Sequence, residues 1–256
     1  MRTQLVHTFL RIGLLTFAAG DDFMNKRIAI YLTNPWPANA EPDDQHYGEM
    51  FEDMLKPKMP DATFVHFDNV SGAFPNDPTE FDAVVITGSS AFVTDTAPWI
   101  ETLFEHIRKI DEAETKLFAV CFGHQAVAMA LGGKVEHRDI VLGSPEIEVT
   151  SAREWMQPST DKLRLFAGNF QQVVEVPETL EVLASHPACP VVMTAKGSHL
   201  MTVQFHPEFS ADYMHGYIDL ISQDITAECA VAGRYEIDQG ADGAVFADWA
   251  AAFLNH

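Results

Sequence analysis

The sequence has few basic residues: 16 Lys and Arg stand against 37 Asp and Glu, which gives a formal net charge of −21. Proteins that bind nucleic acid or anionic lipid use clustered Lys and Arg to displace counterions from phosphates. The composition opposes both kinds of binding. We therefore expect no nucleic-acid partner and no membrane partner.

Cysteine is scarce as well. The three cysteines, Cys121, Cys189 and Cys229, are odd in number and show no CxxC spacing. A disulfide scaffold or a zinc ribbon needs paired cysteines at closer spacing. The count favours a reducing compartment, so we expect a cytoplasmic protein.

Long apolar runs are missing too, since no stretch approaches the roughly 20 residues of a membrane helix. The short apolar stretch 12–20 follows Arg2 and loosely resembles a secretion signal, but His7 and Arg11 interrupt that region. Met24 directly precedes a predicted strand and looks like a natural start. We treat residues 1–23 as an N-terminal extension, either an upstream start or a weak signal-like segment, and 24–256 as one domain.

Several cofactor and metal motifs do not occur. There is no GxxxxGK[ST] phosphate loop, no GxGxxG after a strand, no HExxH and no EF-hand loop. The 11 histidines are scattered singly. We therefore expect neither a metal ion nor a cofactor.

Apolar runs that alternate with amphipathic stretches predict an α/β fold. We expect strands over 28–32, 63–67, 83–87, 117–120 and 200–205. Helices are expected over 47–55 with Asp43 or Asp44 as the cap, from Pro98, over 123–131, around the apolar stripe Met214, Tyr217, Ile218 and Ile221, and over 244–254. This alternation predicts a mainly parallel sheet with helices on both faces. Between 134 and 205 short strand-like pieces indicate an antiparallel extension.

Cys121 lies where a predicted strand meets a predicted helix, in the sequence Val120-Cys121-Phe122-Gly123. A sharp turn at such a junction projects a nucleophile away from the sheet, and Ala119 and Gly123 are small enough to permit it. The helix N-terminus favours the reactive thiolate. The alternative is a buried structural cysteine, which is the commoner role of an isolated cysteine at a strand end.

His206 follows another predicted strand, in the sequence His206-Pro207-Glu208. Its imidazole is a candidate base for Cys121, and Glu208 is placed to orient the ring. His186-Pro187 shows that the His-Pro step occurs without an acid, so the step alone carries little weight. His124 is a competing base, but it belongs to the helix from which the nucleophile points away.

Gly88 ends the predicted strand 83–87 and is followed by Ser89. A glycine there lets a backbone N–H approach a ligand oxygen. Together with the N–H of Phe122, it would form an oxyanion hole. Taken alone, a glycine at a strand end is a weak signal.

The segment 121–125, the His206-Pro207-Glu208 step and the Gly88 turn closely resemble class I, triad-type glutamine amidotransferase domains. Within that family they are similar to the stand-alone subgroup related to the glutaminase part of GMP synthase. The resemblance implies a flavodoxin-like three-layer fold. It also implies cysteine-dependent hydrolysis of the γ-carboxamide of glutamine, or of another γ-glutamyl compound, through a γ-glutamyl thioester, with release of ammonia and glutamate.

The resemblance also implies roles for single residues. Cys121 attacks the γ-carbonyl carbon, while His206, oriented by Glu208, moves the protons. Gly88 and Phe122 hold the oxyanion. Gln125 and Ser89 contact the small-molecule substrate.

Two departures from the family pattern leave the substrate open. Ala119 replaces the usual glycine, and Asn169-Phe170-Gln171-Gln172-Val173 stands where many members have His-x-Asp-x-Val. No Ser-Gly-Gly-x-Asp-Ser synthase loop occurs, so an amidotransferase role requires a separate synthase subunit. The alternatives are a γ-glutamyl peptidase or hydrolase that uses the same triad, and a non-catalytic subunit that retains the fold.

Overall fold

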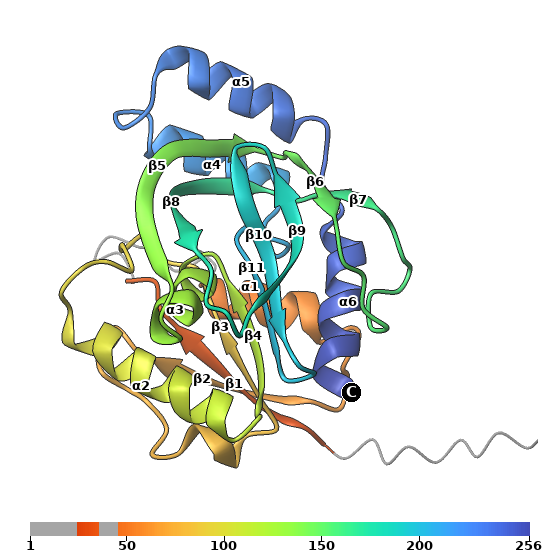
Figure 1. Cartoon of the computed structure of the whole chain (residues 1–256). Coiled ribbons are helices and arrows are strands. Elements are labelled where there is room, and N and C mark those ends of the chain that lie inside the picture. The colour runs from red at the N-terminus through yellow and green to blue at the C-terminus, as the bar shows by residue number, and fades with distance from the viewer. Residues whose placement is uncertain (1–24, 36–45) are drawn as a thin grey trace, which may run out of the picture.

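The computed structural model describes residues 25–35 and 46–256. The predicted extension over 1–23 and the predicted caps Asp43 and Asp44 lie outside the described residues. Figure 1 shows the whole chain, with a central sheet between two layers of helices.

The parallel half of the nine-stranded sheet has the order β2-β1-β3-β4-β11. These strands are β1 (Arg27–Leu32), β2 (Thr63–Asp68), β3 (Ala83–Ile86), β4 (Lys116–Val120) and β11 (Leu200–Val203). Each neighbouring pair among them is parallel. This order, with β11 as the fifth strand, is that of flavodoxin-like folds, in which ligands bind beyond the carboxyl ends of the strands.

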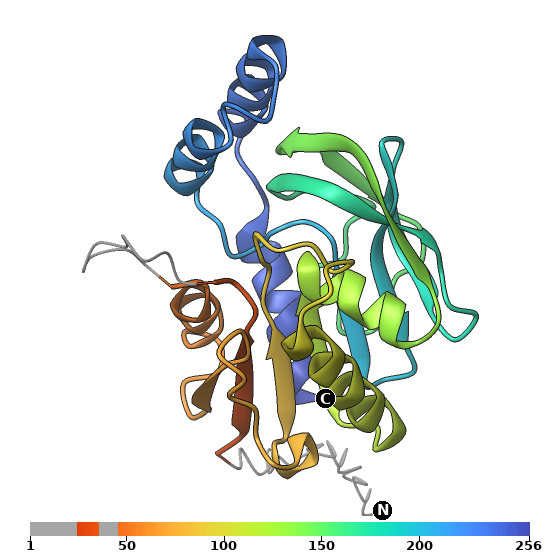
Figure 2. The same cartoon turned by 90° about the vertical axis from the view of Figure 1, so that its left-hand side faces the viewer.

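The rest of the sheet is antiparallel, as predicted for 134–205. From β11 it continues through β10 (Cys189–Lys196), β9 (Glu181–His186), β6 (Glu146–Val149) and β7 (Lys162–Arg164). Two longer strands, β5 (Lys134–Gly143) and β8 (Ala167–Glu175), leave the main sheet and pair with each other. Figures 1 and 2 show this two-stranded sheet at the same end of the molecule as α4 and α5.

Helices cover both faces of the parallel half. On one face α1 (Tyr47–Leu55) and α6 (Gly243–Asn255) bury Phe51 and Trp249 in a core shared with β1 and β4. On the other face α2 (Pro98–Glu112) and α3 (Phe122–Ala130) bury Leu103 and Ala126. The central strands are buried on both sides, which explains their continuous apolar sequences.

The N-cap of helix α1 is His46 rather than one of the predicted aspartates. The His46 side chain accepts a hydrogen bond from the backbone N–H of Gly48, and Glu49 reaches back to the N–H of His46 at 3.1 Å. This reciprocal cap satisfies backbone donors that the first helical turn leaves free. It also fixes Tyr47 as the first residue of the helix.

The chain continues from β11 into α4 (Ala211–Leu220) and α5 (Ala227–Ile237), which pack on each other beside β5. The sequence analysis did not predict α5. Its pattern is weak, since Gly233 and Ile237 are buried while Val231 and Tyr235 are exposed. Every helix in the described part of the chain is too short or too polar to cross a membrane.

Candidate active site

Cys121 lies between β4 and α3 in a conformation that few residues other than glycine adopt. Its φ is 51° and its ψ is −102°. The backbone is held from both sides, because Cys121 N–H donates to the carbonyl of Val203 at 2.8 Å and its own carbonyl accepts from Gln125 N–H at 3.0 Å. A positive φ at a non-glycine residue costs on the order of 1–3 kcal/mol and persists where the surroundings enforce it. The turn therefore matches the strained geometry of a nucleophile elbow.

Gly123 makes this turn compatible with the neighbouring strand. A Cβ at this position would lie 2.8 Å from the carbonyl oxygen of Ile86 in β3. Any side chain would therefore push α3 away from the sheet. The small residue expected here from the sequence has a definite steric reason.

His206 is fixed through its backbone and its ring. Its N–H donates to the carbonyl of Phe166 at 2.7 Å, and its Nδ1 lies 2.7 Å from Oε1 of Glu208. The ring of Phe209 stacks on the imidazole with centroids 4.0 Å apart and planes 6° apart. Since Nδ1 faces Glu208, Nε2 is the ring atom available to Cys121.

The charge state of His206 follows from these neighbours. Burial of the ring opposes protonation, but the charges of Glu208 and of the Cys121 thiolate outweigh it and raise the pKa of His206 to about 10. The side chains of His206 and Glu208 are 5% and 0% exposed, so water screens these charges little. The geometry therefore favours the protonated imidazole of His206 at neutral pH.

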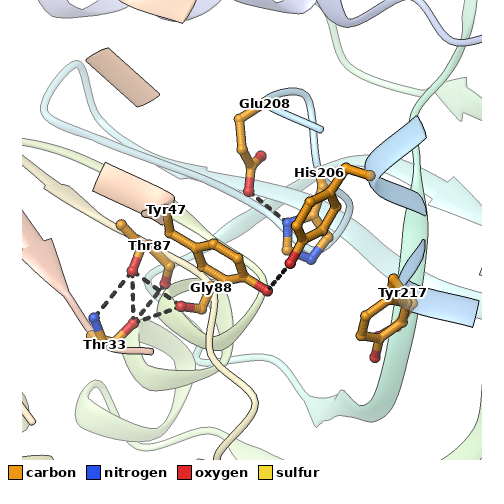
Figure 3. Close-up of polar contacts among 9 residues, drawn as sticks. Thr33, Tyr47, Thr87, Gly88, His206, Glu208 and Tyr217 are labelled. Carbon is orange, nitrogen blue, oxygen red and sulfur yellow. Dashed lines mark hydrogen bonds and ion pairs between the residues drawn. The ribbon is translucent and has the colours of Figure 1, made fainter. Parts of the chain in front are cut away.

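Gly88 lies directly beside this pair. A Cβ at Gly88 would be 2.8 Å from Cε1 of His206 and 3.5 Å from Cβ of Cys121. The turn is held by Thr33, which follows β1: its hydroxyl lies 3.0 Å from the carbonyl oxygens of both Thr87 and Gly88 (Figure 3). These contacts place the backbone of Gly88 against the side chains of Cys121 and His206.

A cavity of about 450 Å³ opens beside Cys121. Phe122, Gln125 and Ser89 line it, so the predicted contact residues lie together. The side-chain nitrogen of Gln125 donates to the carbonyl of Gln171 at 2.8 Å and to Oε1 of Gln204 at 3.0 Å. Both of its donor hydrogens are therefore used within the protein, and only its carbonyl oxygen is left for a ligand.

The divergent segment 169–173 lies in β8 and forms another part of the cavity wall. Asn169, Phe170 and Gln171 line the cavity. Oε1 of Gln171 accepts from Val93 N–H at 3.2 Å, and its Nε2 donates to the Thr94 hydroxyl at 2.7 Å. Gln171 therefore ties the loop after β3 to β8.

The competing base and the other cysteines lie elsewhere. His124 is buried in α3, where Nδ1 lies 2.6 Å from the hydroxyl of Thr202, and burial lowers the pKa of its ring to about 3. Burial raises the pKa of the Cys189 thiol to about 12, which keeps it protonated. Cys229 lies in α5, away from the cavity lining. Among the described residues no group of His, Cys, Asp and Glu side chains has the arrangement of a metal site.

The sequence analysis gave no role in the site to three residues that lie there: Thr33, Tyr47 and Tyr217. Thr33 follows a strand parallel to β3, and since such strands end at one edge, this position was a usable signal. Tyr47 accepts a hydrogen bond from the hydroxyl of Tyr213 at 2.8 Å. Burial is the main cause that raises the pKa of Tyr47, and the charge of Cys121 also contributes. Tyr217 was counted in an apolar helical stripe, yet it lines the cavity and donates to the carbonyl of Gly168 at 3.0 Å.

Comparison with known proteins agrees with this architecture. The sequence pattern of the family "Glutamine amidotransferase class-I" matches residues 62–218, which is more than half of the chain. The protein belongs to this family, and the predicted family and flavodoxin-like fold are confirmed.

The relatives of this chain include both γ-glutamyl peptidases and glutamine-hydrolysing synthases. The chain is 30% identical over 171 residues to γ-glutamyl peptidase 3 of Arabidopsis thaliana, a match covering 59% of this chain and 65% of the relative. It is 31% identical over 102 residues to the glutamine-hydrolysing GMP synthase of Psychrobacter arcticus, covering 38% of this chain and 19% of that protein. The matched region thus spans less than two thirds of either relative.

A solved structure supports the fold. A glutamine amidotransferase from Thermotoga maritima superposes with a TM-score of 0.72, covering 90% of this chain and 99% of that one. The sequence identity is 18%, so this similarity concerns the fold alone.

Proposed function

We propose that this protein hydrolyses γ-glutamyl compounds through a covalent γ-glutamyl thioester on Cys121. The observation that carries the proposal is the strained Cys121 beside the buried His206–Glu208 pair at the wall of a cavity. A thiolate next to an imidazolium is the activated form of a cysteine nucleophile. Membership in a family of amidotransferases and the match to a γ-glutamyl peptidase support the substrate class.

The first half of the proposed reaction is acylation. The Cys121 sulfur attacks the γ-carbonyl carbon, and the oxyanion is held by the N–H groups of Gly88 and Phe122. His206 gives its proton to the amide nitrogen as the carbon–nitrogen bond breaks. The amine leaves, and a γ-glutamyl thioester stays on the enzyme.

The second half is hydrolysis of the thioester. His206, now neutral, removes a proton from water, and the hydroxide attacks the same carbonyl carbon. The carbon–sulfur bond breaks, glutamate leaves and the thiolate–imidazolium pair returns. Glu208 holds the ring in one orientation through both halves.

The cavity favours substrates larger than glutamine. The glutamyl group and the leaving group share a cavity of about 450 Å³, which leaves room for a substituent on the leaving nitrogen. Pockets of this size match small organic ligands. This favours release of an amine over release of ammonia alone.

A second candidate function is glutamine hydrolysis that supplies ammonia to a separate synthase subunit. The match to a GMP synthase supports it. In that case glutamine would be the better substrate, and turnover would rise when the partner is added.

The test is glutamate release by the purified full chain from γ-glutamyl dipeptides and from glutamine. We expect release from the dipeptides, and no release by the Cys121→Ala variant. Ligand-induced thermal stabilisation without any turnover would instead identify a non-catalytic binding subunit.

A further inference from the structure

The cavity continues past Cys121 along the C-terminal end of α4. Its wall there is formed by Tyr217, Leu220, Ile221 and Asp224. Resting on the proposed function, we propose that this wall is the subsite for the leaving amine and that it selects apolar amines without a carboxylate.

The position of His206 gives the direction of the leaving group. His206 must protonate the departing nitrogen, so the amine's substituent extends on the imidazole side of Cys121. Helix α4 begins at Ala211, shortly after Glu208, and Figure 3 shows Tyr217 on the other side of the His206 ring from Glu208. The glutamyl part is left with the rest of the lining, which includes Gln125 and Ser89.

Tyr217 connects the reacting cysteine to this wall. Burial, followed by the charges of Cys121, Tyr213 and Asp224, raises the pKa of Tyr217. The Tyr217 ring therefore lies within electrostatic reach of both the cysteine and Asp224. A substituent that leaves Cys121 along this ring arrives beside Asp224.

The rim of the cavity is unusually apolar for an exposed surface. Leu220 is 79% exposed and Phe92 is 36% exposed, and both line the cavity. They are two of the four exposed large hydrophobic residues in the described part of the chain, the others being Val231 and Tyr235. Exposed apolar side chains at the mouth of a pocket favour an apolar substituent that covers them.

Charge on the wall has one sign. Asp224 lines the cavity, whereas no described lining residue is Lys, Arg or His. The leaving group of a γ-glutamyl dipeptide is an amino acid, whose carboxylate would meet the negative charge of Asp224. The corresponding decarboxylated amine offers the same apolar contact without that repulsion.

A pair of substrates that differ only in this carboxylate provides the test: γ-glutamyl-phenethylamine and γ-glutamyl-phenylalanine. We expect the native chain to have a kcat/KM about tenfold higher for the phenethylamine compound at low ionic strength, because Asp224 is exposed and its field is screened by salt. Asp224→Asn should lower this preference about threefold, and Asp224→Lys should reverse it. Asp212→Asn removes an exposed carboxylate from the first turn of α4, the helix that precedes Asp224, and should keep the native preference.

The outcomes separate the inference from the proposed function. Equal or better hydrolysis of the phenylalanine compound by the native chain would overturn the inference. So would an equal loss for both substrates in Asp224→Asn, which would place the substrate's α-ammonium group at Asp224. No hydrolysis of any γ-glutamyl compound would instead contradict the proposed function.

The apolar part of the subsite has its own control. Leu220→Asn should lower kcat/KM for both aromatic substrates a few-fold relative to glutamine. Val231→Asn changes another exposed apolar residue, in α5, that does not line the cavity, and should leave this ratio as in the native chain. If Leu220→Asn and Val231→Asn had the same ratio of kcat/KM for the aromatic substrates to kcat/KM for glutamine, an apolar leaving-group subsite would be contradicted.

Discussion

The cavity has two walls that are built in different ways. The inner wall consists of Cys121 and Phe122, which line the cavity, and of Gly88 and His206, which adjoin Cys121. It follows the ends of buried parallel strands, and backbone hydrogen bonds hold Cys121 and His206 in place. The outer wall is formed by residues of the loop after β3, of β8 and of the α4 end, namely Phe92, Gln171, Tyr217, Leu220 and Asp224. Exposed side chains occur mainly in this second group.

This difference separates two tasks. A buried wall with fixed geometry suits groups whose placement must not vary during bond breaking. The outer wall is more exposed at Phe92, Leu220 and Asp224, and side chains at such positions can change without disturbing the sheet. We expect changes in the inner wall to lower kcat and changes in the outer wall to act on KM and on substrate choice.

The largest effect is expected at Cys121. Cys121→Ala should lower kcat/KM for γ-glutamyl hydrolysis by on the order of 10⁴-fold or more, because the thioester cannot form. The readout is glutamate release under steady-state conditions. Cys189→Ala removes a buried thiol from β10 and should retain activity. A comparable loss of activity in Cys121→Ala and Cys189→Ala would mean that Cys121→Ala acts by disturbing the fold.

The next largest effect is expected at Gly88. Gly88→Ala places a Cβ 2.8 Å from Cε1 of His206, so the ring must move. Small displacements of reacting groups lower the rate on the order of 10²-fold. We expect a loss of this size in kcat, while circular dichroism shows a folded protein.

The matched control is Gly216→Ala in α4, where the added methyl meets nothing within 4 Å. It should keep activity and raise the free energy of unfolding by about 0.5–1 kcal/mol. Full activity in Gly88→Ala would contradict the placement of Gly88 against the reacting side chains.

An intermediate effect is expected at Glu208. In the native protein the pKa of His206 is raised to about 10, so kcat/KM should fall as the pH rises through that value and the imidazolium is lost. Glu208→Gln keeps a hydrogen-bond acceptor but removes the charge, which should move this fall to lower pH and reduce activity at neutral pH about 10²-fold.

The control for Glu208 is Asp111→Asn. Asp111 pairs with His199 at 2.9 Å, outside the cavity lining. Asp111→Asn should leave the fall of kcat/KM at high pH unchanged. If this fall were also unchanged in Glu208→Gln, an electrostatic role for Glu208 would be contradicted.

The smallest effect is expected in the outer wall. Gln171→Ala removes the two hydrogen bonds that tie the loop after β3 to β8, each worth about 1 kcal/mol. KM should rise about five- to tenfold while kcat changes little. The neighbouring Gln172 bonds instead to the carbonyl of Ala188 at 3.0 Å, so Gln172→Ala should leave KM unchanged. If Gln171→Ala lowered kcat and left KM unchanged, the expected division of kcat effects to the inner wall and KM effects to the outer wall would be contradicted.

The sequence predicted the inner wall better than the outer wall. Cys121, His206 and Gly88 each follow an apolar strand, and parallel strands bring such ends to one edge, so their convergence was readable. Tyr217 has an apolar body and a polar tip, and helical spacing alone does not say whether such a residue faces the core or a cavity. Its contact with Gly168 depends on the antiparallel sheet of β5 and β8, which leaves the main sheet.

The missed helix has a related cause. Helix α5 buries little beyond Gly233 and Ile237 and contacts mainly α4 and β5. Such a helix lacks the wide apolar stripe by which helices are recognised in a sequence. The cap of α1 was misplaced because histidine is outside the residues normally favoured at that position.

The most direct measurement is the mass of the protein quenched in acid during turnover of a γ-glutamyl substrate, followed by peptide mapping. We predict a covalent adduct of one glutamyl group on the peptide that contains Cys121, and its absence from the Cys121→Ala variant. An adduct on a peptide containing Cys189 or Cys229, or sustained glutamate release by Cys121→Ala, would contradict the assignment of Cys121 as the nucleophile.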